Sequence, residues 1–112
     1  YMTKKYTSQA YITLFNMLDL RFNKSKDSEL GRLLSDMNPD LFIDDTSADS
    51  ACFEDYLNCC ASYESDLILN AYNASVEFLK LYCNEFGFEI MSVIEDVSLQ
   101  EYEHCFDNII NE

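Results

Sequence analysis

Carboxylates are the chemically active groups that this chain gathers in one place. Seven of them lie within a short stretch: Asp36, Asp40, Asp44, Asp45, Asp49, Glu54 and Asp55. No Lys or Arg follows Arg32 until Lys80, so these charges have no basic neighbours in sequence. Carboxylates in such a run can bind a metal ion, or they can bind the Lys and Arg side chains of a protein partner.

The metal-binding interpretation fails on spacing. Asp36-Met-Asn-Pro-Asp40 resembles the start of a calcium loop, but Leu41 stands at the sixth position, where the sharp turn needs Gly. Ser47 stands at the twelfth position, where a bidentate Glu is needed. We therefore expect no metal ion and no other cofactor.

Catalytic chemistry has one weak candidate, the neighbouring pair His104 and Cys105. Neighbours on a helix point in different directions, so we interpret this pair as structural and keep an enzyme that uses it as an alternative. Cys59-Cys60 lacks the spacing of a zinc site, and two glycines are too few for a phosphate-binding loop. We expect no enzymatic activity and no small-molecule substrate.

The charge of the chain is large and unevenly placed. Its 112 residues carry a net charge of −14. Residues 1–32 hold six basic and three acidic residues, whereas residues 33–112 hold one basic and eighteen acidic residues. Such a field repels nucleic acid and anionic membranes and attracts cationic partners. Acidic surfaces also serve solubility alone, and the charge by itself does not separate these two roles.

Five cysteines argue for a reducing compartment. An odd number does not fit a closed disulfide framework, and neither a secretory segment nor an apolar run of transmembrane length occurs. We expect a cytoplasmic protein with reduced, mostly buried thiols. Tyr1 precedes Met2, and we expect Met2 to be the native start.

Helices must position the carboxylates, because two Gly and one Pro are too few turn residues for many short strands. With 48% apolar and 14% aromatic residues, the chain can form one hydrophobic core. The sequence predicts an all-α single domain, residues 1–112, built as a bundle of five or six helices. Apolar spacing places these helices at about residues 7–24, 27–37, 50–61, 66–86, 90–97 and from 99 onward.

Capping residues, a proline and a glycine set the expected ends of these helices. Thr7 or Ser8 is expected to cap the first helix, and Ser65 or Asp66 the fourth. Asp49 is a natural cap for the third helix. Pro39 ends the second helix and Gly87 the fourth, and Ser98-Leu-Gln-Glu101 is a capping box that opens the last.

The chain also contains a weak internal repeat. Ala10-Tyr11 matches Ala71-Tyr72, and the segment from Leu30 to Asp36 matches the segment from Ile90 to Asp96. The repeat predicts two pseudo-symmetric helical hairpins, with the third helix and the acidic loop inserted between them. Two amphipathic helix pairs can also resemble each other by chance, and that alternative stays open.

Residues 10–56 resemble a family of small bacterial immunity proteins from contact-dependent growth inhibition and related polymorphic toxin systems. The segments that carry the resemblance are Ala10-Tyr11, Phe15-Asn-Met-Leu18, Ser28-Glu-Leu-Gly-Arg-Leu-Leu-Ser-Asp-Met37, Asp45-Thr-Ser-Ala-Asp-Ser-Ala51 and Phe53-Glu-Asp-Tyr56. The chain departs from the family pattern at Thr46, where Gly is expected, and at Ser50, where Pro opens the helix.

The resemblance implies a cytoplasmic helical protein that binds the toxic C-terminal domain of a delivered effector. A nuclease domain fits the charge, because nucleases are basic where they hold phosphates. We expect a basic toxin domain as partner, and neither nucleic acid nor a membrane. The expected toxin-binding residues are Asp40, Asp44, Asp45, Asp49, Glu54 and Asp55. The alternative is a helical adaptor or structural module that binds another basic protein.

Overall fold

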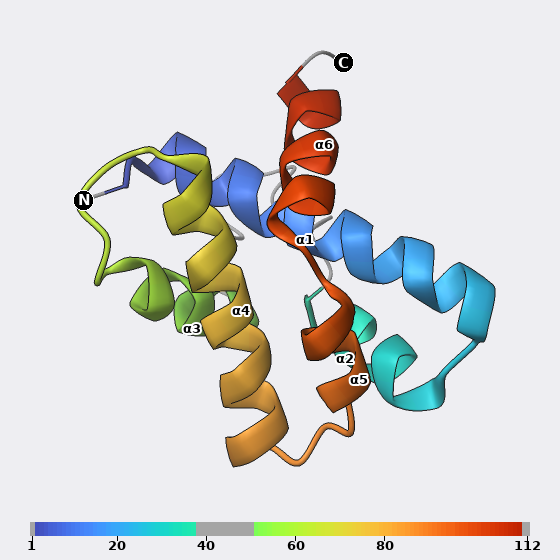
Figure 1. The fold of residues 1–112 in the computed structure, drawn as a ribbon. Helices are drawn as coiled ribbons and strands as arrows, with labels where there is room; N and C mark the ends of the chain where they lie inside the picture. The colour runs from blue at the N-terminus through green and yellow to red at the C-terminus, as the bar shows by residue number, and fades with distance from the viewer. Residues whose placement is uncertain (1, 38–50, 111–112) are drawn as a thin grey trace.

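Helices form all of the secondary structure in the residues that the computed structural model describes, 2–37 and 51–110. The helices are α1 (Lys4–Ser25), α2 (Ser28–Met37), α3 (Ala51–Cys60), α4 (Ile68–Glu85), α5 (Met91–Asp96) and α6 (Leu99–Ile110). They pack as a bundle in which α1 and α4 are the long members (Figure 1). The prediction of an all-α bundle of five or six helices is confirmed.

Helix α1 is one of two helices at the centre of the packing, since it contacts α2, α3, α4 and α6, and α4 contacts α1, α3, α5 and α6. Its inward face follows helical spacing, and the side chains on it are fully or almost fully buried: Ala10, Tyr11, Leu14, Met17 and Leu18. Tyr11 meets Phe53 and Tyr56 of α3 edge-on, with ring centroids 5.2 Å apart in both pairs. Each such pair contributes about 0.5–1.5 kcal/mol beyond area burial, which fixes α3 against α1.

The first helix begins one turn earlier than the sequence predicts. Thr3 is its N-cap, and the Thr3 hydroxyl accepts a 3.3 Å hydrogen bond from the Tyr6 backbone N–H. Thr7 lies inside the helix, where its hydroxyl donates to the Thr3 carbonyl oxygen. The predicted caps Thr7 and Ser8 are therefore wrong, because the helix already begins at Lys4 and Thr3 caps its first turn.

Asp66 has a different role from the predicted one. Helix α4 begins at Ile68 after Leu67, with no side-chain cap. The Asp66 carboxylate instead accepts hydrogen bonds from the backbone N–H and the hydroxyl of Thr3, at 2.7 and 2.9 Å. Asp66 thus ties the start of α1 to the segment before α4.

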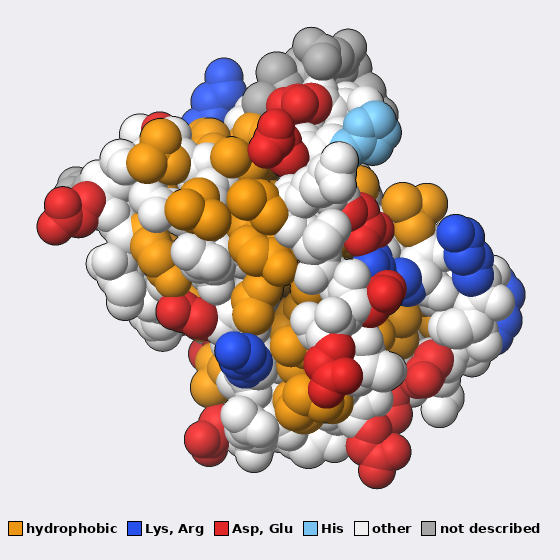
Figure 2. Space-filling view, viewed as in Figure 1, with side chains coloured by type: hydrophobic (Ala, Val, Ile, Leu, Met, Phe, Trp, Pro, Cys, Tyr) orange, Lys and Arg blue, Asp and Glu red, His pale blue; other side chains and the backbone are white. Residues whose placement is uncertain are grey.

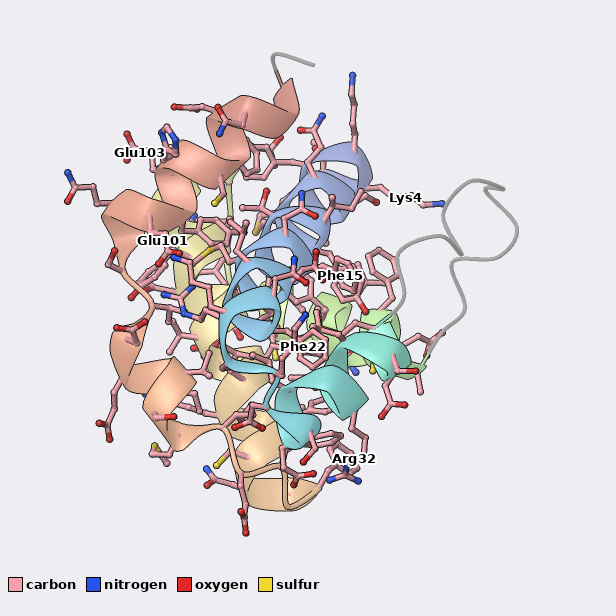
Figure 3. All side chains as sticks on the ribbon, turned by 90° about the vertical axis from the view of Figure 1, so that its right-hand side faces the viewer. Lys4, Phe15, Phe22, Arg32, Glu101 and Glu103 are labelled. Atoms are coloured by element: carbon pink, nitrogen blue, oxygen red, sulfur yellow. The ribbon has the colours of Figure 1, made fainter. Side chains whose placement is uncertain are left out.

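Half of the predicted capping box at α6 forms. The Glu101 backbone N–H donates to the Ser98 hydroxyl at 3.2 Å. The Glu101 carboxylate, labelled in Figure 3, however accepts from Arg21 of α1. The Arg21 guanidinium also donates to Asp96 at 3.0 Å. Arg21 is mostly buried, with 17% of its side chain exposed. Because Asp96 belongs to α5 and Glu101 to α6, the network joins these two helices to α1.

Two matching hydrogen bonds support the internal repeat. The Tyr11 hydroxyl donates to the carbonyl oxygen of Met37, the last residue of α2, at 2.9 Å. The Tyr72 hydroxyl donates to the carbonyl oxygen of Val97, the C-cap of α5, at 3.0 Å. In both hairpins a tyrosine of the long helix therefore holds the end of the short helix.

A glycine lies where α2 packs against the end of α1. A Cβ at Gly31 would lie 2.7 Å from Cε1 of Phe22, whose side chain is labelled in Figure 3, so the Phe22 ring would have to shift to admit a side chain there. Gly31 thereby allows α2 to pack closely against the end of α1.

Candidate functional site

The predicted toxin-binding residues fall into two groups. Asp40, Asp44, Asp45 and Asp49 belong to residues 38–50, which lie outside the described part of the chain, as does the predicted cap role of Asp49. Glu54 and Asp55 lie in α3, at the C-terminal end of that segment. Glu54 is exposed and Asp55 is half-buried.

Asp55 is held in place by α4. Its carboxylate accepts a 2.7 Å hydrogen bond from the hydroxyl of Tyr82, a residue that is 5% exposed. The Cys52 sulfur lies 3.2 Å from the same hydroxyl oxygen. Burial is the main reason why the pKa of Tyr82 is raised far above its usual value, and Cys52 and Asp55 add to the effect. The tyrosine therefore remains a proton donor to Asp55 at every physiological pH.

Asp36 is a further carboxylate near Asp55, and it was not among the predicted toxin-binding residues. It is exposed near the end of α2. Burial raises the pKa of the Cys52 thiol, the hydrogen bond with Tyr82 opposes this, and the negative charges of Asp36 and Asp55 raise the pKa further. Both carboxylates thus act on one thiol, so the fold brings the end of α2 and the start of α3 together.

Glu77 of α4 extends the same surface beside the C-terminal end of α3. It accepts a 2.8 Å hydrogen bond from the Tyr63 hydroxyl. Burial, followed by the charges of Glu77 and Asp55, raises the pKa of Cys59 to about 11. We call Asp36, Glu54, Asp55 and Glu77 the acidic α3 surface. No sequence pattern marks Glu77 as part of it, because only the packing of α3 on α4 brings it there.

The basic residue that precedes this surface in sequence is engaged elsewhere. Arg32 of α2 pairs with Glu29 at 3.1 Å, and its guanidinium lies over the Phe88 ring, 4.1 Å from the centroid. Both contacts lie near the α4–α5 connection, where the Glu89 backbone N–H also donates to Glu29. Arg32 is therefore committed to joining α2 to that connection.

The His104–Cys105 pair lacks the features of an activated nucleophile. His104 is exposed on α6, and Cys105 is half-buried beside it. Burial and the Glu101 charge raise the pKa of the Cys105 thiol, although Arg21 opposes them. A raised pKa keeps the thiol protonated at neutral pH, whereas nucleophilic cysteines need a lowered one.

Neither a metal site nor a membrane-spanning helix occurs in the part of the chain that the structure describes. Over residues 2–37 and 51–110, no three His, Cys, Asp or Glu side chains gather in a way that could hold a metal ion. Within those ranges, too, no helix combines the length and the apolar character needed to cross a bilayer.

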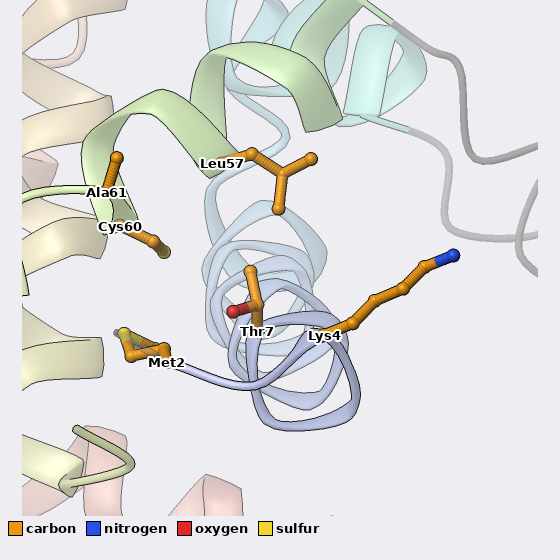
Figure 4. A pocket seen from close by; sticks show the side chains of 6 residues that line it. All are labelled: Met2, Lys4, Thr7, Leu57, Cys60 and Ala61. Atoms are coloured by element: carbon orange, nitrogen blue, oxygen red, sulfur yellow. The ribbon is translucent and has the colours of Figure 1, made fainter. Parts of the chain in front are cut away.

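One hollow lies between the start of α1 and the end of α3 (Figure 4). Its volume is about 390 Å³, and its lining is apolar apart from Thr7 and Lys4. The lining residues are Met2, Lys4, Thr7, Leu57, Cys60 and Ala61. No carboxylate of the acidic α3 surface lines it, so this hollow and the acidic surface are separate features.

Comparison with known proteins returns no relative: no family model matches the chain, and neither a curated protein nor a solved structure matches it significantly. Functional inference therefore depends on the chain's own residues.

Proposed function

We propose that this chain is an immunity protein that binds the basic toxic domain of a delivered bacterial effector in the cytoplasm and blocks it. The observation that carries the proposal is the acidic α3 surface. Three of its carboxylates, Asp36, Glu54 and Asp55, come from the two helices that flank residues 38–50, which contain four further aspartates, and Glu77 comes from α4. The resemblance of residues 10–56 to immunity proteins supports the same function.

Electrostatics explains how such a surface would work. A cationic phosphate-binding groove is attracted to a dense set of carboxylates, which speeds association and fixes orientation. Asp55 and Glu77 are already held by tyrosine hydroxyls in the unbound protein. Less conformational entropy is then lost when a Lys or Arg of the toxin docks on them. The bound protein excludes the substrate of the toxin by occupying its basic groove.

Co-expression tests the proposal. The chain is produced in bacteria together with the toxin domain encoded by the adjacent gene, and growth and co-purification are measured. We expect restored growth and a stable complex, and loss of both when Glu54 and Asp55 are changed to Lys. A matched control changes the exposed Glu85 and Glu89 to Lys, which alters the net charge equally.

Other results would overturn the proposal. Growth arrest that persists although the folded chain is present removes the immunity function. A complex with a neighbouring non-toxic basic protein would instead favour a helical adaptor.

A further inference from the structure

The internal repeat continues into the third helix of each half. Tyr56 of α3 and Tyr102 of α6 are both buried. The Tyr56 ring lies edge-on to Tyr11, with centroids 5.2 Å apart, and the Tyr102 ring lies edge-on to Tyr72, with centroids 5.9 Å apart. Tyr11 and Tyr72 are the tyrosines that the sequence repeat pairs. Helix α3 therefore corresponds to α6.

The hydroxyls of these two buried tyrosines reach matching turns of the long helices. Tyr102 donates to the carbonyl oxygen of Ala10 at 2.9 Å. The Tyr56 hydroxyl lies 2.8 Å from the hydroxyl of Ser75, which donates to the carbonyl oxygen of Ala71. Ala10 and Ala71 are again paired by the sequence repeat. The halves α1–α3 and α4–α6 thus share one arrangement, in which each third helix packs on the long helix of the other half.

A polar contact is found at the same place in both halves. Arg21 of α1 and Tyr82 of α4 are equivalent, because each lies ten residues after the tyrosine that holds its short helix. Asp55 and Glu101 are equivalent, because each directly precedes the buried tyrosine of its third helix. The Tyr82 hydroxyl donates to Asp55, and the Arg21 guanidinium donates to Glu101.

In the half that ends with α6, an arginine joins two acids at this place. The Arg21 guanidinium donates to Asp96 of α5 at 3.0 Å and to Glu101 of α6 at 2.7 Å. The space-filling view shows Lys or Arg atoms between Asp and Glu side chains beside α5 and α6 (Figure 2). A planar guanidinium suits two carboxylates, because its donors point outward in a fixed arrangement. The chain itself therefore shows which group this arrangement of acids binds.

In the half that ends with α3, the equivalent acids are Asp36 and Asp55. Both lie close enough to the Cys52 thiol to raise its pKa, so they also lie near each other. Tyr82 stands in the place of the arginine, and its neutral hydroxyl donates to one oxygen of Asp55. In the described part of the chain, neither acid forms an ion pair with a Lys or Arg. The two halves thus differ in the cation rather than in the acids.

We propose that Asp36 and Asp55 form a binding site for an arginine side chain of a partner protein. This arginine takes the place that Arg21 takes in the other half of the molecule. A lysine suits the site less well, because its ammonium group is a compact point charge that matches two carboxylates poorly. Where the partner is the toxin domain, this inference rests on the proposed function and identifies one of its contacts.

Titration of the full chain with small cations tests the site. The probe is ethylguanidinium at millimolar concentration, and the control is ethylammonium, which has the same charge without the planar group. NMR follows the side-chain carboxyl carbons. We expect ethylguanidinium to shift the signals of Asp36 and Asp55 with saturation, and at least about threefold more than ethylammonium does. The signals of Asp96 and Glu101 should stay nearly unchanged, because Arg21 already binds both acids.

The other half of the molecule provides a matched control. Arg21→Ala removes the guanidinium from Asp96 and Glu101, so ethylguanidinium should then shift the signals of both pairs of acids. Asp36→Asn/Asp55→Asn removes the charges of the proposed site with little change of shape, and the other carboxyl signals should then show no saturable shift. The unmodified chain and this Asn variant decide the proposal if Arg21→Ala does not fold.

Three results would overturn the proposal. They are equal shifts with both cations, shifts centred on acids other than Asp36 and Asp55, and shifts at Asp96 and Glu101 of Arg21→Ala without any at Asp36 and Asp55. None of these measurements needs the toxin. Failed rescue by a chain that binds ethylguanidinium would remove the immunity function alone, whereas rescue by a chain that does not bind it would remove the arginine site alone.

Discussion

Tyr82 and Asp55 are joined by a 2.7 Å hydrogen bond in which a buried hydroxyl of α4 donates to a carboxylate at the surface of α3. The bond crosses the contact between these two helices. It therefore belongs to the packing of the bundle and also orients one acid of the proposed binding surface.

Removing the Tyr82 hydroxyl should weaken the fold. We expect Tyr82→Phe to lower the free energy of unfolding by about 1–3 kcal/mol, because the half-buried Asp55 loses a donor to its charged form. Urea denaturation measures the loss. Tyr63→Phe is the control, since its bond to Glu77 is exposed and water can replace it. Equal losses in the two variants would show that the Tyr82–Asp55 bond stabilises the fold no more than the exposed Tyr63–Glu77 bond does.

The two tyrosines of the internal repeat should differ in their contributions. Tyr11 is fully buried, so Tyr11→Phe leaves the Met37 carbonyl oxygen without this donor in the core, at a cost of about 1–3 kcal/mol. Tyr72 is partly exposed, and water can approach the Val97 carbonyl after Tyr72→Phe, so we expect a loss below about 1.5 kcal/mol. Thermal unfolding of both variants compares them, and a larger loss for Tyr72→Phe would contradict this ranking.

Alkaline pH should destabilise the protein. Burial raises the pKa of Cys59 to about 11 and that of Cys60 to about 12, from a usual value of 9.0. Between pH 9.0 and these raised pKa values, the thiols are deprotonated in the unfolded chain but protonated in the folded chain. The free energy of unfolding therefore falls as pH rises through this range. We expect the free energy of unfolding to decrease from about pH 9 to about pH 12, with buried tyrosines adding to the decrease at the upper end.

Replacing the two thiols provides the control for this pH dependence. Cys59→Ala/Cys60→Ala should show a flatter decrease between about pH 9 and pH 11, whatever its stability at pH 7. Urea denaturation at a series of pH values gives both curves. An unchanged slope in the double variant would assign the pH dependence to other groups.

Charge reversal tests the acids predicted to bind the toxin. Asp44→Lys/Asp45→Lys/Glu54→Lys should slow association and weaken binding of the toxin domain, most strongly at low salt, where electrostatic steering is least screened. Stopped-flow kinetics measures the association rate. A control triple variant, Glu85→Lys/Glu89→Lys/Asp107→Lys, changes net charge by the same amount at exposed positions outside the acidic α3 surface. Undiminished affinity of the first variant at low salt would remove these acids from the binding surface.

The sequence alone determined the helical class and five of the six helix ranges to within about two residues. These features follow from local rules, since apolar spacing selects a helix face and Pro39 or Gly87 ends a helix. Gly87 indeed follows α4 with a positive φ of 74°. The concentration of acids around residues 36–55 was equally visible in the sequence, because charge needs no fold to be counted.

Only the tertiary structure decided what the individual acids do. Asp66 and Glu101 have the residue types and spacing of helix caps, yet their carboxylates bind Thr3 and Arg21 from distant parts of the chain. Glu77 lies on the same surface as Asp55 because α3 packs on α4, and no local sequence pattern predicts that packing. A carboxylate binds the best donors within reach, and the packing of helices far apart in sequence determines which donors those are.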